Sequence, residues 1–175
     1  MWRWWASGIP LVLLTLLAAP SQATTLNELR VAVRIFDFMT DPPRGRTPLA
    51  VIFDGQNKAS QEDAVSIGNW LNSGISSEKA QFIPVLVDVL HLNEVPYVRV
   101  GIVAGGASAH FERVLDYALK NHMVTISSDM GCMQSGICTV GIAGTPRVEV
   151  VINRAVAASC GVEFSEAFRL MVREY

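Results

Sequence analysis

The sequence predicts an α/β domain with a mostly parallel sheet flanked by helices and a C-terminal antiparallel hairpin at one edge. Strand-like and helix-like segments alternate along the chain, which is the order typical of parallel sheets with crossover helices. The strand-like run 49–53 (LAVIF) is apolar throughout, as strands buried on both faces are, and 82–89 (FIPVLVDV) is the second strand. Two later strand-like segments are separated by the short turn Gly144-Thr145-Pro146, which favours a hairpin.

The first 23 residues have the three-part layout of a secretory signal peptide. Arg3 precedes an apolar run over 9–19, and Ser21-Gln22-Ala23 places small residues at the −3 and −1 positions of a cleavage site. The run is far shorter than the roughly 20 residues that span a bilayer, which argues against the alternative of an uncleaved anchor. We therefore expect a signal peptide over 1–23, export to the periplasm, and one mature domain over 24–175.

Composition and motifs exclude several function classes. The chain carries 14 basic and 16 acidic residues without a basic cluster, so neither nucleic acid nor an anionic membrane surface is an expected partner. After the leader, no segment is apolar for long enough to insert into a membrane. No G-x-S-x-G, P-loop or zinc-finger spacing is present. We therefore expect a protein that is not an enzyme and that uses no cofactor or metal.

The other elements follow from helix caps and apolar periodicity. Thr25 with Glu28 forms a capping box before a helix, and Ser60 with Asp63 resembles a second one. Ser108 is the expected cap of a third helix, which follows the turn Gly105-Gly106. The predicted helices cover 25–38, 60–71, 109–120, 154–159 and 165–173, and the further strands cover 98–103, 123–126, 138–142 and 148–152.

The mature chain has three cysteines, Cys132, Cys138 and Cys160. An exported protein meets oxidising conditions, and the five residues between Cys132 and Cys138 include a glycine that lets the loop curl back. A structural disulfide between them is the favoured interpretation, with a redox-responsive bridge and a zinc site as alternatives. Cys160 lies among alanines, which is typical of a small buried apolar residue. Its alternatives are a bridge to a second chain or exchange with the other pair.

Four residues are candidate contacts for a ligand or a partner. Gly105 and Ser108 lie between a strand and a helix, where backbone N–H groups are able to hold an anion. Asp129 follows the end of another strand, and α/β folds place ligands at such ends. Trp70, one position before Leu71 on its helix, is expected to be half-exposed and is a candidate interface anchor. Ordinary turn chemistry and packing are the alternative explanations.

The second half of the chain resembles the YfiR family of small periplasmic proteins. The resemblance rests on the order of 115–118 (LDYA), 123–129 (MVTISSD), the cysteine loop, and 148–153 (VEVVIN) before an alanine-rich helix. It implies a compact α/β domain, often dimeric, and its characterised member restrains a membrane-bound diguanylate cyclase in a redox-dependent way. Cys132 and Cys138 resemble that protein's late-loop disulfide. The chain departs from it in having no second cysteine pair in its first half, and Cys160 has no counterpart there.

Two hypotheses of different class follow. The first is a periplasmic regulatory protein that contacts the periplasmic region of an inner-membrane signalling protein, and the resemblance implies that it acts in cyclic-di-GMP signalling. The second is a small periplasmic solute-binding domain that uses the strand-end loops around Gly105 and Asp129.

Overall fold

The computed structural model describes residues 23–95, 97–144 and 147–175, and all the strands among them form one sheet of seven in the order β2-β1-β3-β4-β5-β6-β7. Neighbouring strands are parallel except for the antiparallel pair β5–β6, so the predicted α/β class and C-terminal hairpin are confirmed. The strands are β1 Gly45–Phe53, β2 Ala80–Asp88, β3 Val100–Val103, β4 Val124–Ser127, β5 Val140–Ala143, β6 Glu149–Ile152 and β7 Arg173–Glu174. The predicted leader, apart from Ala23, and two residues of the predicted hairpin turn lie outside the described residues.

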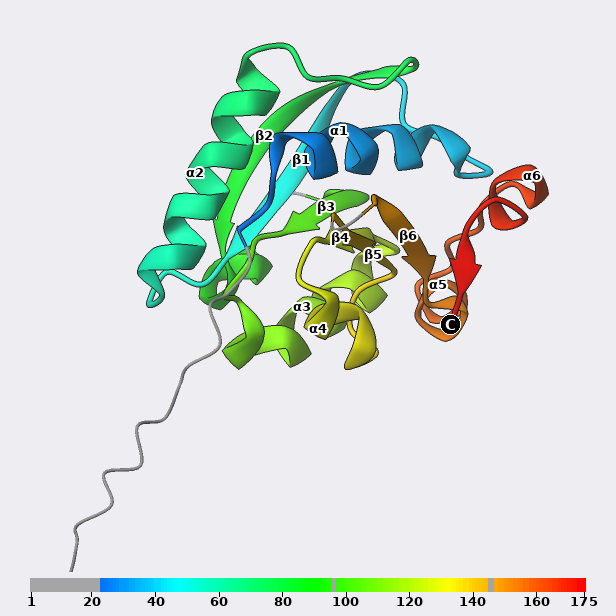
Figure 1. Ribbon diagram of the computed structural model, residues 1–175. Coiled ribbons are helices and arrows are strands. Elements are labelled where there is room, and N and C mark those ends of the chain that lie inside the picture. Colours follow the sequence, from blue (N-terminus) through cyan, green and yellow to red (C-terminus); the bar gives the residue numbers. More distant parts are fainter. Residues whose placement is uncertain (1–22, 96, 145–146) are drawn as a thin grey trace, which may run out of the picture.

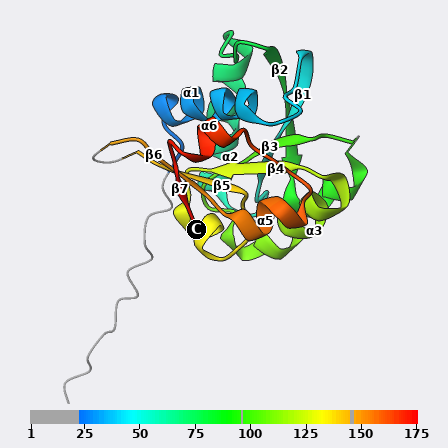
Figure 2. The same ribbon diagram turned by 90° about the vertical axis from the view of Figure 1, so that its right-hand side faces the viewer.

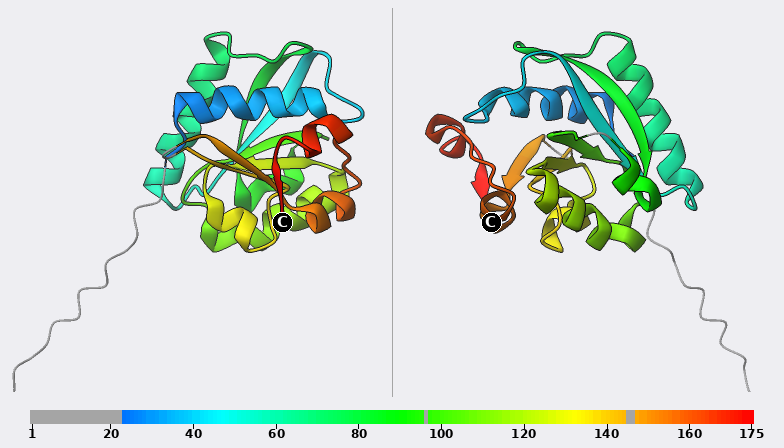
Figure 3. Two further views of the ribbon diagram at one scale, coloured as in Figure 1. Left: turned by 45° about the vertical axis from the view of Figure 1, so that its right-hand side comes forward. Right: turned by 180° about the vertical axis from the view of Figure 1, so that it is seen from behind.

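Helices flank both faces of this sheet (Figures 1 and 3). The helix α1 contacts α2, and these two lie on one side, while α3 and α4 lie on the other, where α3 packs against η2. The α-helices are α1 Leu26–Ile35, α2 Lys58–Asn72, α3 Phe111–Asn121, α4 Met130–Gln134, α5 Arg154–Ser159 and α6 Glu166–Arg169, and the 3-10 helices are η1 Phe36–Phe38, η2 Val89–Glu94 and η3 Ser108–His110. No helix in the described ranges combines the length and apolarity needed to span a membrane.

The first five strands have the order of a doubly wound α/β sheet. The chain leaves β1 through α2 to the outer strand β2, and then returns across the sheet through η2 to β3 on the other side of β1. In such sheets ligands bind beyond the carboxyl ends of the strands at the point where the strand order reverses. Here that point lies between the ends of β1 and β3, so the loops that follow Phe53 and Val103 border the place where such a sheet binds a ligand.

Several local predictions are confirmed by side-chain contacts. The hydroxyl of Thr25 accepts a hydrogen bond from the Glu28 amide, and the Glu28 carboxylate accepts one from the Thr25 amide, which completes the capping box. The central part of β1 is buried throughout, as its unbroken apolar run predicts. His122 ends α3 in the left-handed conformation, and Gly161, also at positive φ, follows α5.

The two predicted N-terminal caps, Ser60 and Ser108, are wrong. The N-cap of α2 is Asn57, whose side chain accepts from the Ala59 amide, because the helix begins two residues before Ser60. Ser60 instead accepts a hydrogen bond from the Asp54 amide at 3.1 Å. Ser108 begins η3 and forms no cap, so α3 starts only at Phe111.

The C-terminal region also differs from the prediction. The helix expected over 165–173 ends as α6 at Arg169, and Arg173–Glu174 then pairs with β6 as the edge strand β7. Ser165 does cap α6, but Phe168 packs inward and is followed by a turn. The short helix α4, which contains Cys132 and overlaps the start of the cysteine loop, has no apolar repeat from which it could be predicted.

Candidate functional site

A buried polar network lies at the carboxyl edge of the sheet, centred on Asp63 of α2. The Thr24 amide donates to Asp63 Oδ1 at 2.8 Å, while the Thr24 hydroxyl and the Gly105 amide donate to Asp63 Oδ2 at 3.0 and 2.8 Å. The hydroxyl groups of Thr24 and Ser128 are 2.9 Å apart. Because the Thr24 hydroxyl gives its hydrogen to Asp63, Ser128 is the donor in that contact. The network therefore connects the start of the described chain to the loops after β3 and β4.

The electrostatics of Asp63 reflect its burial. Only 4% of the residue is exposed, and loss of solvent raises the pKa of its carboxyl above the ordinary value. The hydrogen bonds from Gly105 and Thr24 lower that pKa, because they favour the charged form, and the nearby charge of Glu28 raises it. The effect of burial on this pKa is larger than that of the hydrogen bonds, so these bonds do not fully compensate the negative charge of the carboxylate.

Glu28 is the second buried carboxylate of this region. It is 1% exposed, and its Oε2 accepts the Thr25 amide at 2.7 Å. Its Oε1 finds no hydrogen-bond partner among the described residues. This oxygen faces Gly144, where an added Cβ would collide with it. A buried oxygen without a partner is uncommon in folded proteins, and it marks a place where a donor or a positive charge would be favourable.

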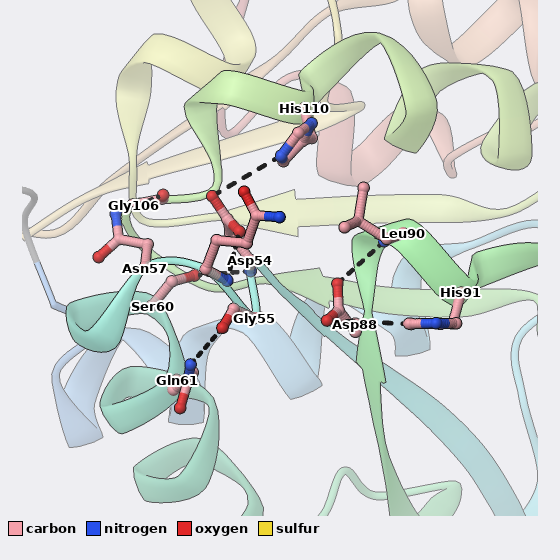
Figure 4. A network of polar contacts seen from close by, with 11 residues as sticks. Asp54, Gly55, Asn57, Ser60, Gln61, Asp88, Leu90, His91, Gly106 and His110 are labelled. Atoms are coloured by element: carbon pink, nitrogen blue, oxygen red, sulfur yellow. Dashed lines mark hydrogen bonds and ion pairs between the residues drawn. The ribbon is translucent and has the colours of Figure 1, made fainter.

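A second group of polar contacts surrounds the loop after β1 (Figure 4). The buried Asp54 accepts the Gln56 amide at 2.8 Å, and its other carboxylate oxygen is 3.9 Å from His110 Nε2. The Asn57 side chain donates to the Gly106 carbonyl at 2.9 Å, which connects this loop to the loop after β3. Nearby, Asp88 caps η2 through the Leu90 amide, and its Oδ2 is 3.9 Å from His91.

These carboxylates and imidazoles are distributed rather than convergent. Within the described ranges, no three His, Cys, Asp or Glu side chains are grouped so as to hold a metal ion. Their hydrogen bonds are mostly to backbone amides of adjacent loops, which fixes the shape of the carboxyl edge.

The four predicted contact residues are only partly brought together. Gly105 and Asp129 both lie at the carboxyl edge, but the Gly105 amide donates to Asp63 and the Asp129 carboxylate caps α4 through the Gly131 amide at 2.9 Å. Ser108 is exposed and borders an open hollow of about 490 Å³ with His110 and Arg113. Trp70 is half-buried near the end of α2, at the opposite edge of the sheet. Asp63, Thr24 and Glu28 carry the buried polar contacts, and the sequence pattern assigned them only local roles or none.

The cysteine loop is closed by a disulfide between Cys132 and Cys138, whose Cα atoms are 5.3 Å apart. Both residues are fully buried, and Cys132 lies in α4, whose last residues belong to the closed loop. The same loop contributes Ser135 and Ile137 to the hollow beside Ser108. Cys160 is free and fully buried, and burial raises the pKa of its thiol. It therefore behaves as a packed apolar side chain and is not exposed for a bridge to a second chain.

An exposed apolar groove lies at the β7 end of the sheet. Figure 2 shows this end of the sheet, with β7, facing the viewer. Phe168 of α6 is buried and stacks on Phe38 with ring centroids 4.6 Å apart, so the chain that follows turns outward. As a result Leu170 is 82% and Met171 68% exposed. We call this surface the C-terminal groove; it encloses about 580 Å³ and is lined by Arg147, Val148, Glu149, Val150, Leu170, Met171, Val172 and Arg173.

Comparison with protein-family models gave no match for this chain, and no curated protein matches it significantly.

Proposed function

We propose that this protein works outside the cytoplasm as a regulatory protein that binds the periplasmic region of an inner-membrane signalling protein. The observation that carries this proposal is the C-terminal groove. Leu170 and Met171 are among the most exposed apolar side chains of the described residues, and Val148 beside them is 44% exposed. Contiguous exposed apolar side chains with a polar rim are typical of protein interaction sites.

The edge strand β7 adds a second feature suited to protein contact. It ends the strand order and pairs with β6 on one side, and no other strand of the described residues pairs with its outer backbone groups. An edge of this kind is able to accept a strand from a partner. The ion pair between Arg173 and Glu149, with atoms 2.6 Å apart, holds charged groups at the rim of the groove. Rim charges of this kind orient a partner more than they add affinity.

The resemblance to the YfiR family supplies the class of partner. In that family a small periplasmic protein restrains a diguanylate cyclase anchored in the inner membrane, and the order of segments in the second half of this chain resembles it. The disulfide in the late loop agrees with an oxidising compartment. A homodimer and control by the redox state of Cys132 and Cys138 belong to the same proposal.

Capture from detergent-solubilised membranes tests the proposal. The tagged mature chain is expected to recover one inner-membrane protein with a periplasmic region, and Leu170→Asp with Met171→Asp to reduce recovery by about tenfold or more. Val65→Asp is the matched control, because Val65 is 50% exposed on α2 and lies outside the groove. Recovery that is unchanged by the groove substitutions, or equally reduced by the control, would contradict the proposal.

The solute-binding alternative is favoured by the hollow beside Ser108. Its lining includes His110 and Arg113, which suit an anionic solute, although Gly105 and Asp129 are engaged in internal hydrogen bonds. A metabolite that raises the unfolding temperature of the mature chain in a saturable way would support this alternative. Loss of that shift in Arg113→Ala would place the solute in the hollow.

A further inference from the structure

Two buried carboxylates lie beside the residue at which the mature chain is expected to begin. Asp63 is 4% exposed and Glu28 1% exposed, and the charge of Glu28 raises the pKa of Asp63. Neither forms an ion pair with a basic side chain among the described residues. Buried charges are costly unless an opposite charge or sufficient hydrogen bonds compensate them. The region therefore has an excess of negative charge.

Thr24 is positioned to correct that excess. Its backbone nitrogen lies 2.8 Å from Asp63 Oδ1, and the next nitrogen, that of Thr25, lies 2.7 Å from Glu28 Oε2. Thr24 itself is 7% exposed, whereas Ala23 before it is exposed. A positive charge on the Thr24 nitrogen would thus lie against one buried carboxylate and close to the other.

We propose that cleavage of the Ala23–Thr24 bond creates an α-ammonium group on Thr24 that docks on Asp63 as the counter-ion the buried site lacks. This inference rests on the export step of the proposed function. Water hydrolyses the peptide bond: its oxygen joins the Ala23 carbonyl carbon to give a carboxylate, and its two hydrogens complete the –NH₃⁺ group of Thr24. The N-terminal ammonium of the processed chain thereby binds a carboxylate of the same chain.

Docking changes the strength of an existing contact more than its geometry. The neutral N–H···O⁻ contact seen at Asp63 becomes an ion pair with a hydrogen bond at the same atoms, and such bonds are markedly stronger when both partners are charged. Ala23 is exposed, so water is able to reach the other N–H groups of the ammonium once that residue is removed. Asp63 also accepts the Gly105 amide, and Thr24 contacts Ser128. The ion pair between Thr24 and Asp63 therefore stabilises the loops after β3 and β4.

Four purified chains test this inference without any partner. They begin at Thr24 or carry the single additional residue Ala23, and each is made with Asp63 or with Asp63→Asn. With Asp63 present, adding Ala23 is expected to raise the unfolding equilibrium constant by about tenfold or more, because it replaces the ammonium with an amide. In the Asp63→Asn background the same addition should change it by less than about twofold. Equal effects in both backgrounds would overturn the inference.

The pKa of the Thr24 amine gives a second test that requires no folded Asp63→Asn variant. A free α-amino group titrates near 7.7–8.0, and pairing with Asp63 should raise the pKa of Thr24 above that range. The stabilisation is then fully present below about pH 7.7 and lost as the pH rises through the raised value. The chain with Ala23 should show no such alkaline loss. An unshifted Thr24 pKa, or the same alkaline profile in both chains, would overturn the inference while leaving the export and partner proposals intact.

Discussion

Asp63 and Gly105 are 42 residues apart in the sequence, yet the Gly105 amide donates a 2.8 Å hydrogen bond to the Asp63 carboxylate. This contact holds the loop after β3 against α2, at the point where the strand order of the sheet reverses. Thr24 occupies the other sites on the same carboxylate. The carboxyl edge, where a doubly wound sheet normally binds a ligand, is therefore partly filled by the protein's own N-terminal segment.

Replacement of Asp63 should destabilise the domain. Asparagine has one acceptor oxygen where the carboxylate has two, so Asp63→Asn leaves the Thr24 or Gly105 amide without a partner. We expect the free energy of unfolding to fall by about 2 kcal/mol, the usual cost of an unsatisfied buried donor. Glu62→Gln on the same helix is the control, because Glu62 is exposed and its change should stay within about 0.5 kcal/mol. Urea unfolding measures the change in the free energy of unfolding for both variants. Equal changes would contradict the proposal that the network stabilises the domain.

The pH dependence of the chain that retains Ala23 should reveal the uncompensated charge. Burial raises the pKa of Asp63, so its stabilising contribution is fully present below the unfolded pKa, near 3.9, and is lost as the pH rises through the folded value. The stability advantage of this chain over its Asp63→Asn counterpart should therefore shrink from about pH 4 upward. Unfolding free energies measured at a series of pH values test this, and an advantage that grows with pH would show that the hydrogen bonds outweigh burial.

Reduction of the disulfide should weaken the domain without unfolding it. Closing a loop with a sequence separation of 6 stabilises by about 2 kcal/mol on a chain-entropy estimate. A reductant should therefore lower the unfolding free energy by about that amount, and it should have no effect on a Cys132→Ser/Cys138→Ser chain. Thiol titration of the oxidised, denatured chain should find one thiol, that of Cys160. Three thiols before reduction would contradict the bridge.

Substitution of Gly55 should disturb the neighbouring η2. A Cβ at Gly55 would overlap the Asp88 carboxylate, which caps η2 through the Leu90 amide at 2.9 Å. Gly55→Ala should cost about 1 kcal/mol, because Asp88 must move and lose that hydrogen bond. In an Asp88→Ala background the same change should cost less, since the overlapping group is absent. An unchanged cost in that double-mutant cycle would point to another cause.

The sequence predicted the fold better than the site, for reasons visible in particular residues. The run at 49–53 and the Thr25–Glu28 box are local signals, and local signals determine strands and caps. Asp63, by contrast, resembles a cap partner of Ser60, and only the packing of α2 beside Thr24 and Gly105 gives it three donors. The two-residue strand β7 is too short for any periodicity, so the edge that carries the C-terminal groove could not be predicted.

The proposed export and the docked N-terminus both require a mature chain that begins at Thr24, and export also requires an oxidised cysteine pair. Intact mass spectrometry of the endogenous protein, isolated from the cell envelope with its thiols blocked, measures both at once. We predict a chain that starts at Thr24, with Cys132 and Cys138 joined and Cys160 free. A chain that still starts at Met1 and carries three free thiols, or that is recovered only with cytosolic proteins, would contradict the proposal.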